Sequence, residues 1–92
     1  MKKLTEGEIA ARLESLTQWQ VKSGVLSRTF AFADFVAAMG FVNGVADVAE
    51  RANHHPDIDI RYNKVTLRLV THDAGGITQS DFDLAHEADK LV

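Results

Sequence analysis

Residues 33–52 are the longest apolar-rich segment of the chain, and they limit what the rest of it can form. Their apolar side chains recur at helical spacing in two neighbouring rows, with few charges between them. The rows consist of Phe35, Met39, Val42, Ala46 and Ala49, and of Phe41, Val45 and Val48. A helix that is apolar over so much of its circumference needs cover on more than one side. Because a chain of 92 residues offers little cover, we expect part of this helix to form a subunit interface.

The segment before this helix predicts a shorter helix and a hairpin. Thr5 and Glu8 have capping-box spacing, which favours a helix over 6–16. Two β-prone runs, 19–22 and 25–31, flank a Ser-Gly pair that is typical of a tight turn.

The segment after the long helix predicts a second pair of strands. Pro56 is expected to end the helix, because the residue before a proline is disfavoured in the α region. Apolar and polar side chains then alternate over 58–62 and over 65–70, which indicates two half-buried strands. Asn63-Lys64 is the expected turn between them, since asparagine tolerates a positive φ.

A third helix is expected at the end of the chain, where Thr78 and Asp81 have capping-box spacing ahead of an apolar side. The order of elements is then α-β-β-α-β-β-α. The natural solution for this order is an α+β fold, a four-stranded antiparallel sheet with three helices packed on one face. We expect residues 1–92 to form a single domain.

Composition excludes several classes of protein. A hydrophobic content of 46% excludes a disordered chain, and the absence of cysteine excludes disulfides and thiolate chemistry. The net charge is −3 with the Lys and Arg residues scattered, so we expect no direct nucleic-acid binding. No apolar run approaches the roughly 20 residues of a membrane span. Lys2 and Lys3 are not followed by the apolar stretch of a signal peptide, which favours an unprocessed cytoplasmic protein without membrane attachment.

Three of the four histidines lie where predicted elements end. His54 and His55 end the long helix, and His72 follows the last strand just before a glycine-rich loop. Element ends commonly carry active-site groups, and an unperturbed histidine pKa of about 6.5 suits proton transfer near neutrality. The alternatives are a polar helix C-terminus for the histidine pair and an exposed strand end for His72. His86, inside the last helix, is expected to be an ordinary surface or half-buried residue.

Two acidic residues have more than one interpretation. Glu50, one helical turn before His54, can orient a histidine or be a solvated helix charge. Asp81 can be a helix N-terminal charge or a member of the site. A metal site built from the histidines with Asp73 or Asp81 is disfavoured, because adjacent histidines point apart and neither an HxH nor an HxxxH pair is present. We therefore expect no metal.

Four segments together resemble one known family. Residues 50–56 resemble the E-x-x-x-H-H-P signature of the pterin-4a-carbinolamine dehydratases. Residues 62–65 resemble the family's YNKV turn and strand, 71–73 its T-H-[E/D] element, and 78–85 its last helix. The HHP triplet alone is weakly specific, whereas the three motifs in this order and spacing are strongly specific.

The resemblance implies the same α+β fold and an assembly into homodimers or homotetramers through the second helix and the sheet edges. It also implies an enzyme, a hydro-lyase that dehydrates a 4a-hydroxytetrahydropterin to quinonoid dihydropterin during tetrahydrobiopterin recycling. General acid and base groups suffice for this reaction, so the resemblance implies no metal and no redox cofactor.

The resemblance also implies roles for individual residues. His54 and His72 would be the acid–base pair, and His55 would bind and orient the pterin. Glu50 would support the histidines, and Thr71 and Asp73 would contact the pterin ring. Asp81 joins Glu50, Thr71 and Asp73 as an expected substrate-binding residue.

A different class of function remains open from the sequence. Some relatives act as dimerisation cofactors for a transcription factor through the long helix, and the apolar rows of residues 33–52 suit such a protein-binding role as well as they suit self-assembly. Substituting His54 and His72 would distinguish the two functions, because only catalysis needs these side chains.

Overall fold

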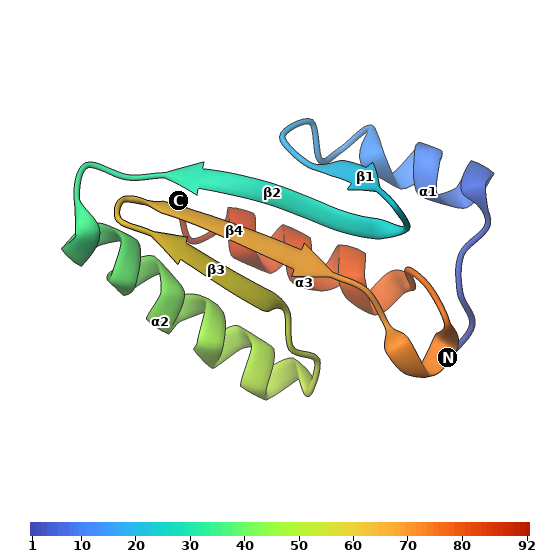
Figure 1. Cartoon of the computed structure of the whole chain (residues 1–92). Coiled ribbons are helices and arrows are strands. Elements are labelled where there is room, and N and C mark those ends of the chain that lie inside the picture. Colours follow the sequence, from blue (N-terminus) through green and yellow to red (C-terminus); the bar gives the residue numbers. More distant parts are fainter.

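Four antiparallel strands form one sheet in the order β1-β2-β4-β3 (Figure 1). The structure is a computed structural model that describes residues 1–92. In chain order its elements are α1 Glu6–Leu13, β1 Gln20–Lys22, β2 Val25–Ala31, α2 Phe35–Ala52, β3 Asp57–Arg61, β4 Lys64–Leu69, a 3₁₀ helix His72–Ala74 and α3 Gln79–Asp89. The predicted α+β class and the order α-β-β-α-β-β-α are confirmed.

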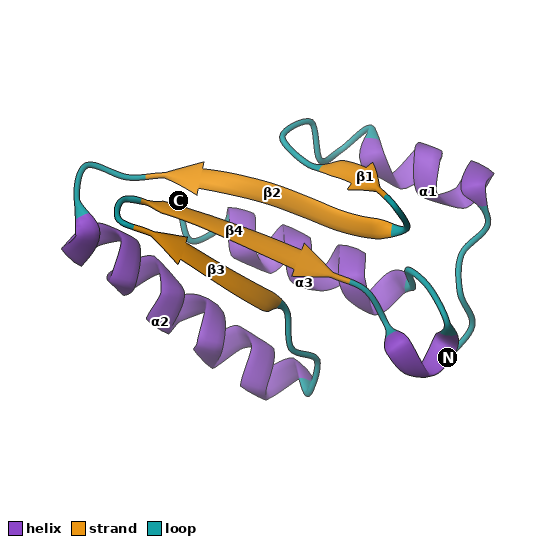
Figure 2. Cartoon of the chain, viewed as in Figure 1, coloured by secondary structure: helices purple, strands orange, loops and turns teal.

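The helices lie on one side of the sheet, and the other side is open (Figure 2). α2 and α3 pack against each other, and α1 joins their layer through Arg12, whose Nε donates to Gln79 Oε1 at 2.6 Å. The alternation along β4 explains the sidedness. Val65, Leu67 and Leu69 are buried under the helices, whereas the residues between them face the open side. None of the helices combines the length and the apolarity needed to cross a membrane.

The core joins the sheet to α2 and α3. The ring centroids of Phe30 and Phe41 are 4.5 Å apart, and this contact packs β2 against α2. A polar contact fixes the end of α3 beside this core. Asp89 Oδ1 accepts from Trp19 Nε1 at 2.9 Å and from Arg28 Nη1 at 2.8 Å. The position of α3 under the sheet is therefore fixed at its C-terminal end as well as along its apolar side.

The first helix is shorter than predicted, ending at Leu13 rather than at residue 16. Its capping box is confirmed. The Thr5 N–H donates to Glu8 Oε1 at 2.8 Å, and this bond holds the pKa of Glu8 below its ordinary value. After Leu13 the chain turns, and the residues that follow bury Leu16 and Trp19 in the core.

α2 ends at Ala52 as predicted but begins two residues later than predicted. It begins at Phe35 rather than at residue 33, since Asp34 is the N-cap and accepts from the Ala37 N–H at 2.8 Å. Its last residue is Ala52, and the C-cap Asn53 adopts a left-handed conformation with φ of 51°, ahead of Pro56. Asparagine tolerates this conformation and ends helices in the same way as glycine does. The reversal at Asn53, and not the proline, sets the direction in which the chain leaves the helix.

The two apolar rows of α2 have different surroundings. Phe41, Val45 and Val48 are buried in the core. In the other row only Ala49 is buried, and Phe35 is among the exposed large side chains. The apolar excess that the sequence indicated therefore lies on the surface of the single chain.

The two hairpin turns were predicted with different success. The Ser-Gly turn between β1 and β2 is confirmed, with both residues at positive φ. The second turn is Tyr62-Asn63, one residue earlier than predicted, and Tyr62 takes the positive φ of 52°. Asn63 is held instead by β2, because its Nδ2 donates to the Phe32 carbonyl at 2.8 Å and its own carbonyl accepts from the Phe32 N–H at 2.8 Å.

Neighbouring residues of β4 test this assignment of faces. We expect Leu67→Ala to lower the free energy of unfolding by about 2–5 kcal/mol, because it leaves a cavity in the core. We expect Arg68→Ala on the open face to change it by less than about 0.5 kcal/mol. Urea denaturation followed by circular dichroism measures both. Equal losses for the two variants would contradict the assignment.

Candidate functional site

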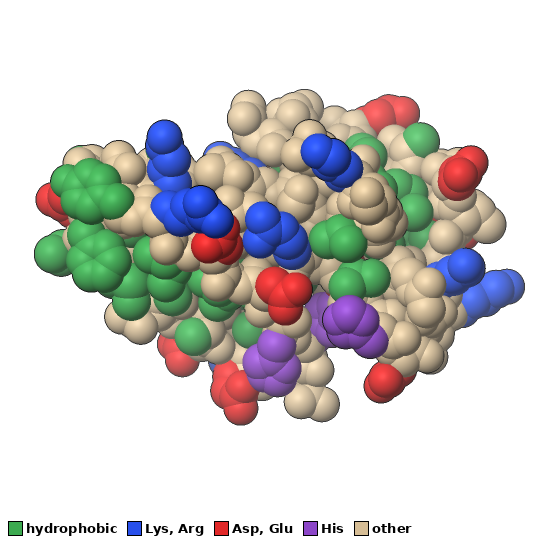
Figure 3. Space-filling view, viewed as in Figure 1, with side chains coloured by type: hydrophobic (Ala, Val, Ile, Leu, Met, Phe, Trp, Pro, Cys, Tyr) green, Lys and Arg blue, Asp and Glu red, His purple; other side chains and the backbone are tan.

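A hollow of about 240 Å³ lies beside two connections, the one from α2 to β3 and the one from β4 to the 3₁₀ helix. Its lining consists of Asn53, His54, His55, Val70, Thr71, His72 and Asp73. The residues come from two segments that are distant in the sequence and adjacent in the fold. All three histidines singled out in the sequence line this hollow, and the histidine side chains gather at the lower edge of the face shown in Figure 3.

The imidazole of His54 is hydrogen-bonded to the buried carboxylate of Asp81. Its Nε2 lies 2.5 Å from Asp81 Oδ1, although the two residues are 27 positions apart. The His54 side chain is 17% exposed and that of Asp81 is 0% exposed. Asp81 thus lies behind the hollow and does not line it.

The other oxygen of Asp81 is fully occupied. Asp81 Oδ2 accepts from the Thr78 N–H and from Thr71 Oγ1, each at 2.8 Å. Thr71 Oγ1 also lies 2.8 Å from Thr78 Oγ1. Since Thr71 donates its single hydrogen to the carboxylate, Thr78 is the donor in that pair. The network leaves no buried side-chain polar atom without a partner, so Asp81 has one well-defined position.

This arrangement selects the tautomer of a neutral His54. An ionised carboxylate only accepts hydrogen bonds, so the proton of His54 lies on Nε2, facing Asp81. His54 Nδ1 makes no hydrogen bond within the protein. It is the ring nitrogen left to take up a proton.

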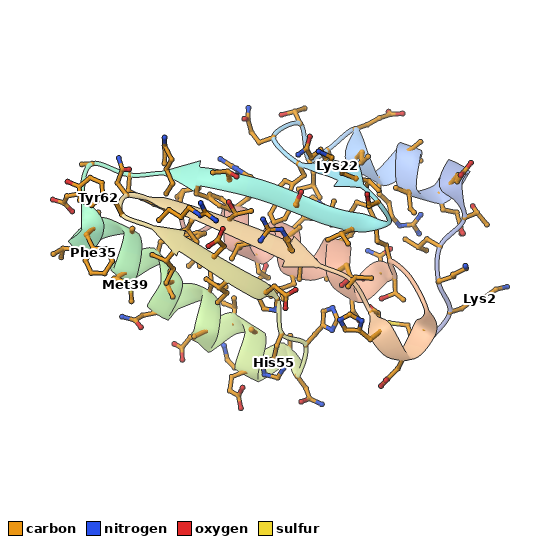
Figure 4. The ribbon with its side chains drawn as sticks, viewed as in Figure 1. Lys2, Lys22, Phe35, Met39, His55 and Tyr62 are labelled. Carbon is orange, nitrogen blue, oxygen red and sulfur yellow. The ribbon has the colours of Figure 1, made fainter.

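His55 has a different partner and a different exposure. Its Nε2 lies 2.7 Å from Glu50 Oε2, and both side chains are largely exposed. Figure 4 shows His55 at the C-terminal end of α2. Glu50 therefore pairs with His55 and not with His54, because the reversal at Asn53 carries His54 off the face of α2 on which Glu50 lies. An exposed pair of this kind contributes at most about 1 kcal/mol.

His72 is exposed at the start of the 3₁₀ helix, and its imidazole makes no hydrogen bond within the protein. The backbone around it is fixed nonetheless. The Gly75 N–H donates to the His72 carbonyl at 3.0 Å, and the Thr71 N–H donates to the Gly76 carbonyl at 3.0 Å. Gly75 has a φ of 77°, which favours glycine at this position. His72 is thus a free imidazole on a firmly placed turn.

The remaining candidates lie apart from the hollow or at its rim. His86 is in α3 beside Ser15, with 3.5 Å between Nε2 and Oγ, and does not line the hollow. Asp73 lines the hollow and is exposed, whereas Glu50 does not line it. No group of three His, Cys, Asp or Glu side chains is arranged to hold a metal ion.

The bond between Asp81 and His54 is the feature that sequence reasoning missed. The capping-box spacing correctly placed Asp81 at the start of α3, with its carboxylate bonded to the Thr78 N–H. A capping carboxylate has a second oxygen, but the sequence does not say which distant element supplies its partner. Only the packing of α3 beneath the hollow makes that partner His54.

The chain was compared with known proteins. The family model for pterin 4 alpha carbinolamine dehydratase matches residues 2–91. The chain belongs to the pterin-4a-carbinolamine dehydratase family. A relative from Acidobacterium capsulatum is 56% identical over the full length of both chains, and one from Sulfurisphaera tokodaii is 50% identical over 100% of this chain and 99% of its own. Both carry the name of this dehydratase as a provisional assignment.

Two solved structures share the fold of this chain. A transcriptional coactivator/pterin dehydratase from Brucella melitensis is 35% identical, with a TM-score of 0.94 and 98% of each chain covered. A pterin dehydratase-like protein described as a RuBisCO assembly factor of the alpha-carboxysome is 24% identical, with a TM-score of 0.65 over 79% of this chain and 84% of its own. At that identity the second likeness concerns the fold alone.

Replacing the buried carboxylate tests the network. We expect Asp81→Ala to lower the free energy of unfolding by about 3 kcal/mol or more, because each buried group left without a partner costs about 1–3 kcal/mol. Asp81→Asn keeps one acceptor and the side-chain volume, so its loss should be smaller. Urea denaturation measures both, with Asp83→Ala on the exposed side of the same helix as control. If Asp81→Ala were no worse than the control, the carboxylate would not hold these segments together.

Proposed function

We propose that this protein catalyses the dehydration of a 4a-hydroxytetrahydropterin to quinonoid dihydropterin, as part of tetrahydropterin recycling. The observation that carries the proposal is a hollow lined by three histidines, one of which is backed by a buried carboxylate. Membership of the pterin-4a-carbinolamine dehydratase family supports the choice of substrate.

The reaction requires two proton transfers at one bicyclic ring. The bond from C4a to the hydroxyl oxygen breaks as that oxygen receives a proton and leaves as water. A proton is removed from a ring nitrogen, and the electron pair of its N–H bond forms the new double bond in the ring. One acid and one base therefore suffice, and the protons balance because the enzyme gives one and takes one.

His54 suits the role of base. Asp81 holds its Nε2–H, as a carboxylate does for the histidine of a catalytic triad, and it stabilises the imidazolium formed when Nδ1 takes a proton. His72 suits the role of acid, because its exposed imidazole exchanges protons with solvent and stands where water can leave. The two histidines enter the hollow from different segments, so they can act on separate atoms of the ring.

The other lining residues suit the binding of the ring. His55 stands beside His54 and is the proposed orienting group, held by Glu50. Asp73 is exposed and offers acceptors for the N–H groups of a pterin. Thr71 has given its hydrogen to Asp81, so towards a substrate it acts as an acceptor.

Activity measurements test these roles. We expect His54→Ala and His72→Ala each to lower the enzymatic rate by about 10²–10⁴-fold, the usual contribution of a general acid or base. The assay follows the absorbance decay of a 4a-hydroxypterin generated by a phenylalanine hydroxylase. His86→Ala is the matched control, since His86 lies away from the hollow. A folded wild-type protein that left the decay unchanged would overturn the proposal.

We further propose that the protein forms homodimers or homotetramers through α2 and the sheet edges. The N-terminal part of α2 leaves Val36 79% exposed, next to an exposed Phe35. Phe35, Met39 and Tyr62 lie together at one end of the molecule in Figure 4. Ile58 and Ile60 on the edge strand β3 are also exposed. A contiguous apolar surface of this kind marks an association site.

A second candidate function rests on the same apolar surface. The Brucella melitensis structure is described as a transcriptional coactivator as well as a pterin dehydratase, so a protein partner is an alternative occupant of α2. This function would not require the histidines. It becomes the leading hypothesis if the protein folds and lacks dehydratase activity.

Charge on the exposed part of α2 tests the association surface. We expect Val36→Glu to lower the mass of the assembly, because a carboxylate buried in an apolar interface loses its hydration. Sedimentation velocity measures the mass, and Thr17→Glu on an exposed loop is the control. An assembly that keeps its mass in Val36→Glu would place the interface elsewhere.

A further inference from the structure

A second and larger hollow lies against the histidine hollow. It has a volume of about 620 Å³ and lies between the N-terminal segment, the turn from β1 to β2, and the loop after the 3₁₀ helix. We call it the N-terminal groove. Val70 and His72 line both hollows. A molecule held by the histidines therefore has a neighbouring space that begins at the same two side chains.

The two volumes suit different parts of one ligand. Pockets for whole drug-sized ligands have volumes of about 300–1,000 Å³. The histidine hollow, at about 240 Å³, lies below that range and suits a bicyclic ring alone. The N-terminal groove lies within the range, so it has room for a group larger than a methyl or a short hydroxyalkyl chain.

Six of the 13 residues that line the groove are hydrophobic. Its hydrophobic lining consists of Leu4, Ile9, Val21, Val25, Val70 and Ile77. Lys3 and Glu6 add one charge of each sign, so the groove has no net charge to select an ion. A ligand group bound there gains mainly from the burial of apolar surface.

The groove is formed before any ligand arrives. The Leu4 N–H donates to the Ile77 carbonyl at 2.8 Å, which ties the N-terminal segment to the loop that follows His72. The Lys3 stem lies over Gly76, where an added Cβ would come within 3.2 Å of Lys3 Cδ. The glycine thus lets the N-terminal segment lie close to the loop, and a preformed wall lowers the entropy cost of binding.

We propose that the N-terminal groove binds the substituent at C6 of the pterin, and that it favours pterins whose substituent is long and contains an apolar or aryl part. This inference rests on the proposed function, which places the pterin ring among the histidines. The substituent would pass over Val70 and His72 into the groove. The protein would then discriminate between substrates by the length and the apolarity of this group.

Two stable pterins test the groove. 6-Methylpterin has the ring with a single methyl group, and pteroic acid has the same ring with an aminobenzoate arm. We expect wild-type protein to bind pteroic acid at least about tenfold more tightly, because the arm buries apolar surface. Val25→Trp places a large side chain in the groove and should remove this advantage while retaining affinity for 6-methylpterin. Ala31→Trp, at the exposed far end of the same strand, is the matched control and should retain the advantage. Isothermal titration calorimetry measures each affinity.

A measurement on the wild-type protein keeps the test independent of how Val25→Trp folds. In amide NMR spectra we expect both ligands to shift the signals of Thr71 and His72, and only pteroic acid to shift those of Gly24 and Gly76. The proposed role of the groove would be overturned if pteroic acid bound no more tightly than 6-methylpterin, or if it left the Gly24 and Gly76 signals unchanged. Neither result would contradict the proposed function. Failure of both ligands to bind, together with unchanged decay of the 4a-hydroxypterin, would overturn the proposed function itself.

Discussion

The Asp81 carboxylate holds together three segments of the chain. It bonds the first turn of α3 through the Thr78 N–H, the end of β4 through the Thr71 hydroxyl, and the exit from α2 through His54. A fully buried carboxylate is strongly disfavoured unless its oxygens are hydrogen-bonded. All three segments must therefore be in place at once, and the histidine hollow opens at the point where they meet.

This dependence links stability to the chemistry of the site. Asp81, which completes the capping box of α3, also fixes the ring orientation and the tautomer of His54. His72 is positioned differently, by backbone hydrogen bonds on either side and by the left-handed Gly75, and its side chain stays free. One histidine is thus rigid and partly buried, and the other is exposed. A difference in surroundings of this kind can give two chemically identical groups different proton affinities, and the proposed division into base and acid depends on it.

Much of this architecture follows from local patterns in the sequence. The strands β3 and β4, the capping box of Thr5 and Glu8, and the apolar rows of α2 depend on neighbouring residues, so the sequence predicts them. The predicted half-burial holds for β4 but not for β3, whose Ile58 and Ile60 are exposed in the single chain. The prediction fails where a contact between residues that are distant in the sequence determines the local conformation. Asn63 was expected to take the positive φ, but its bonds to Phe32 on β2 leave that conformation to Tyr62. The partnership of Asp81 with His54 spans 27 positions and follows no spacing rule.

The histidine hollow and the exposed apolar end of α2 lie apart in the fold. The histidine hollow and the N-terminal groove meet at Val70 and His72, near the C-terminal end of α2 and the end of β4. The exposed apolar side chains Phe35, Val36 and Tyr62 lie at the opposite ends of α2 and β3. Between the two regions α2 is fixed in the core by Phe41, Val45 and Val48, so a substitution at the exposed apolar end is not expected to move the histidines. The Brucella melitensis structure is described both as a transcriptional coactivator and as a pterin dehydratase, and a spatial separation of this kind is compatible with one fold that carries more than one function.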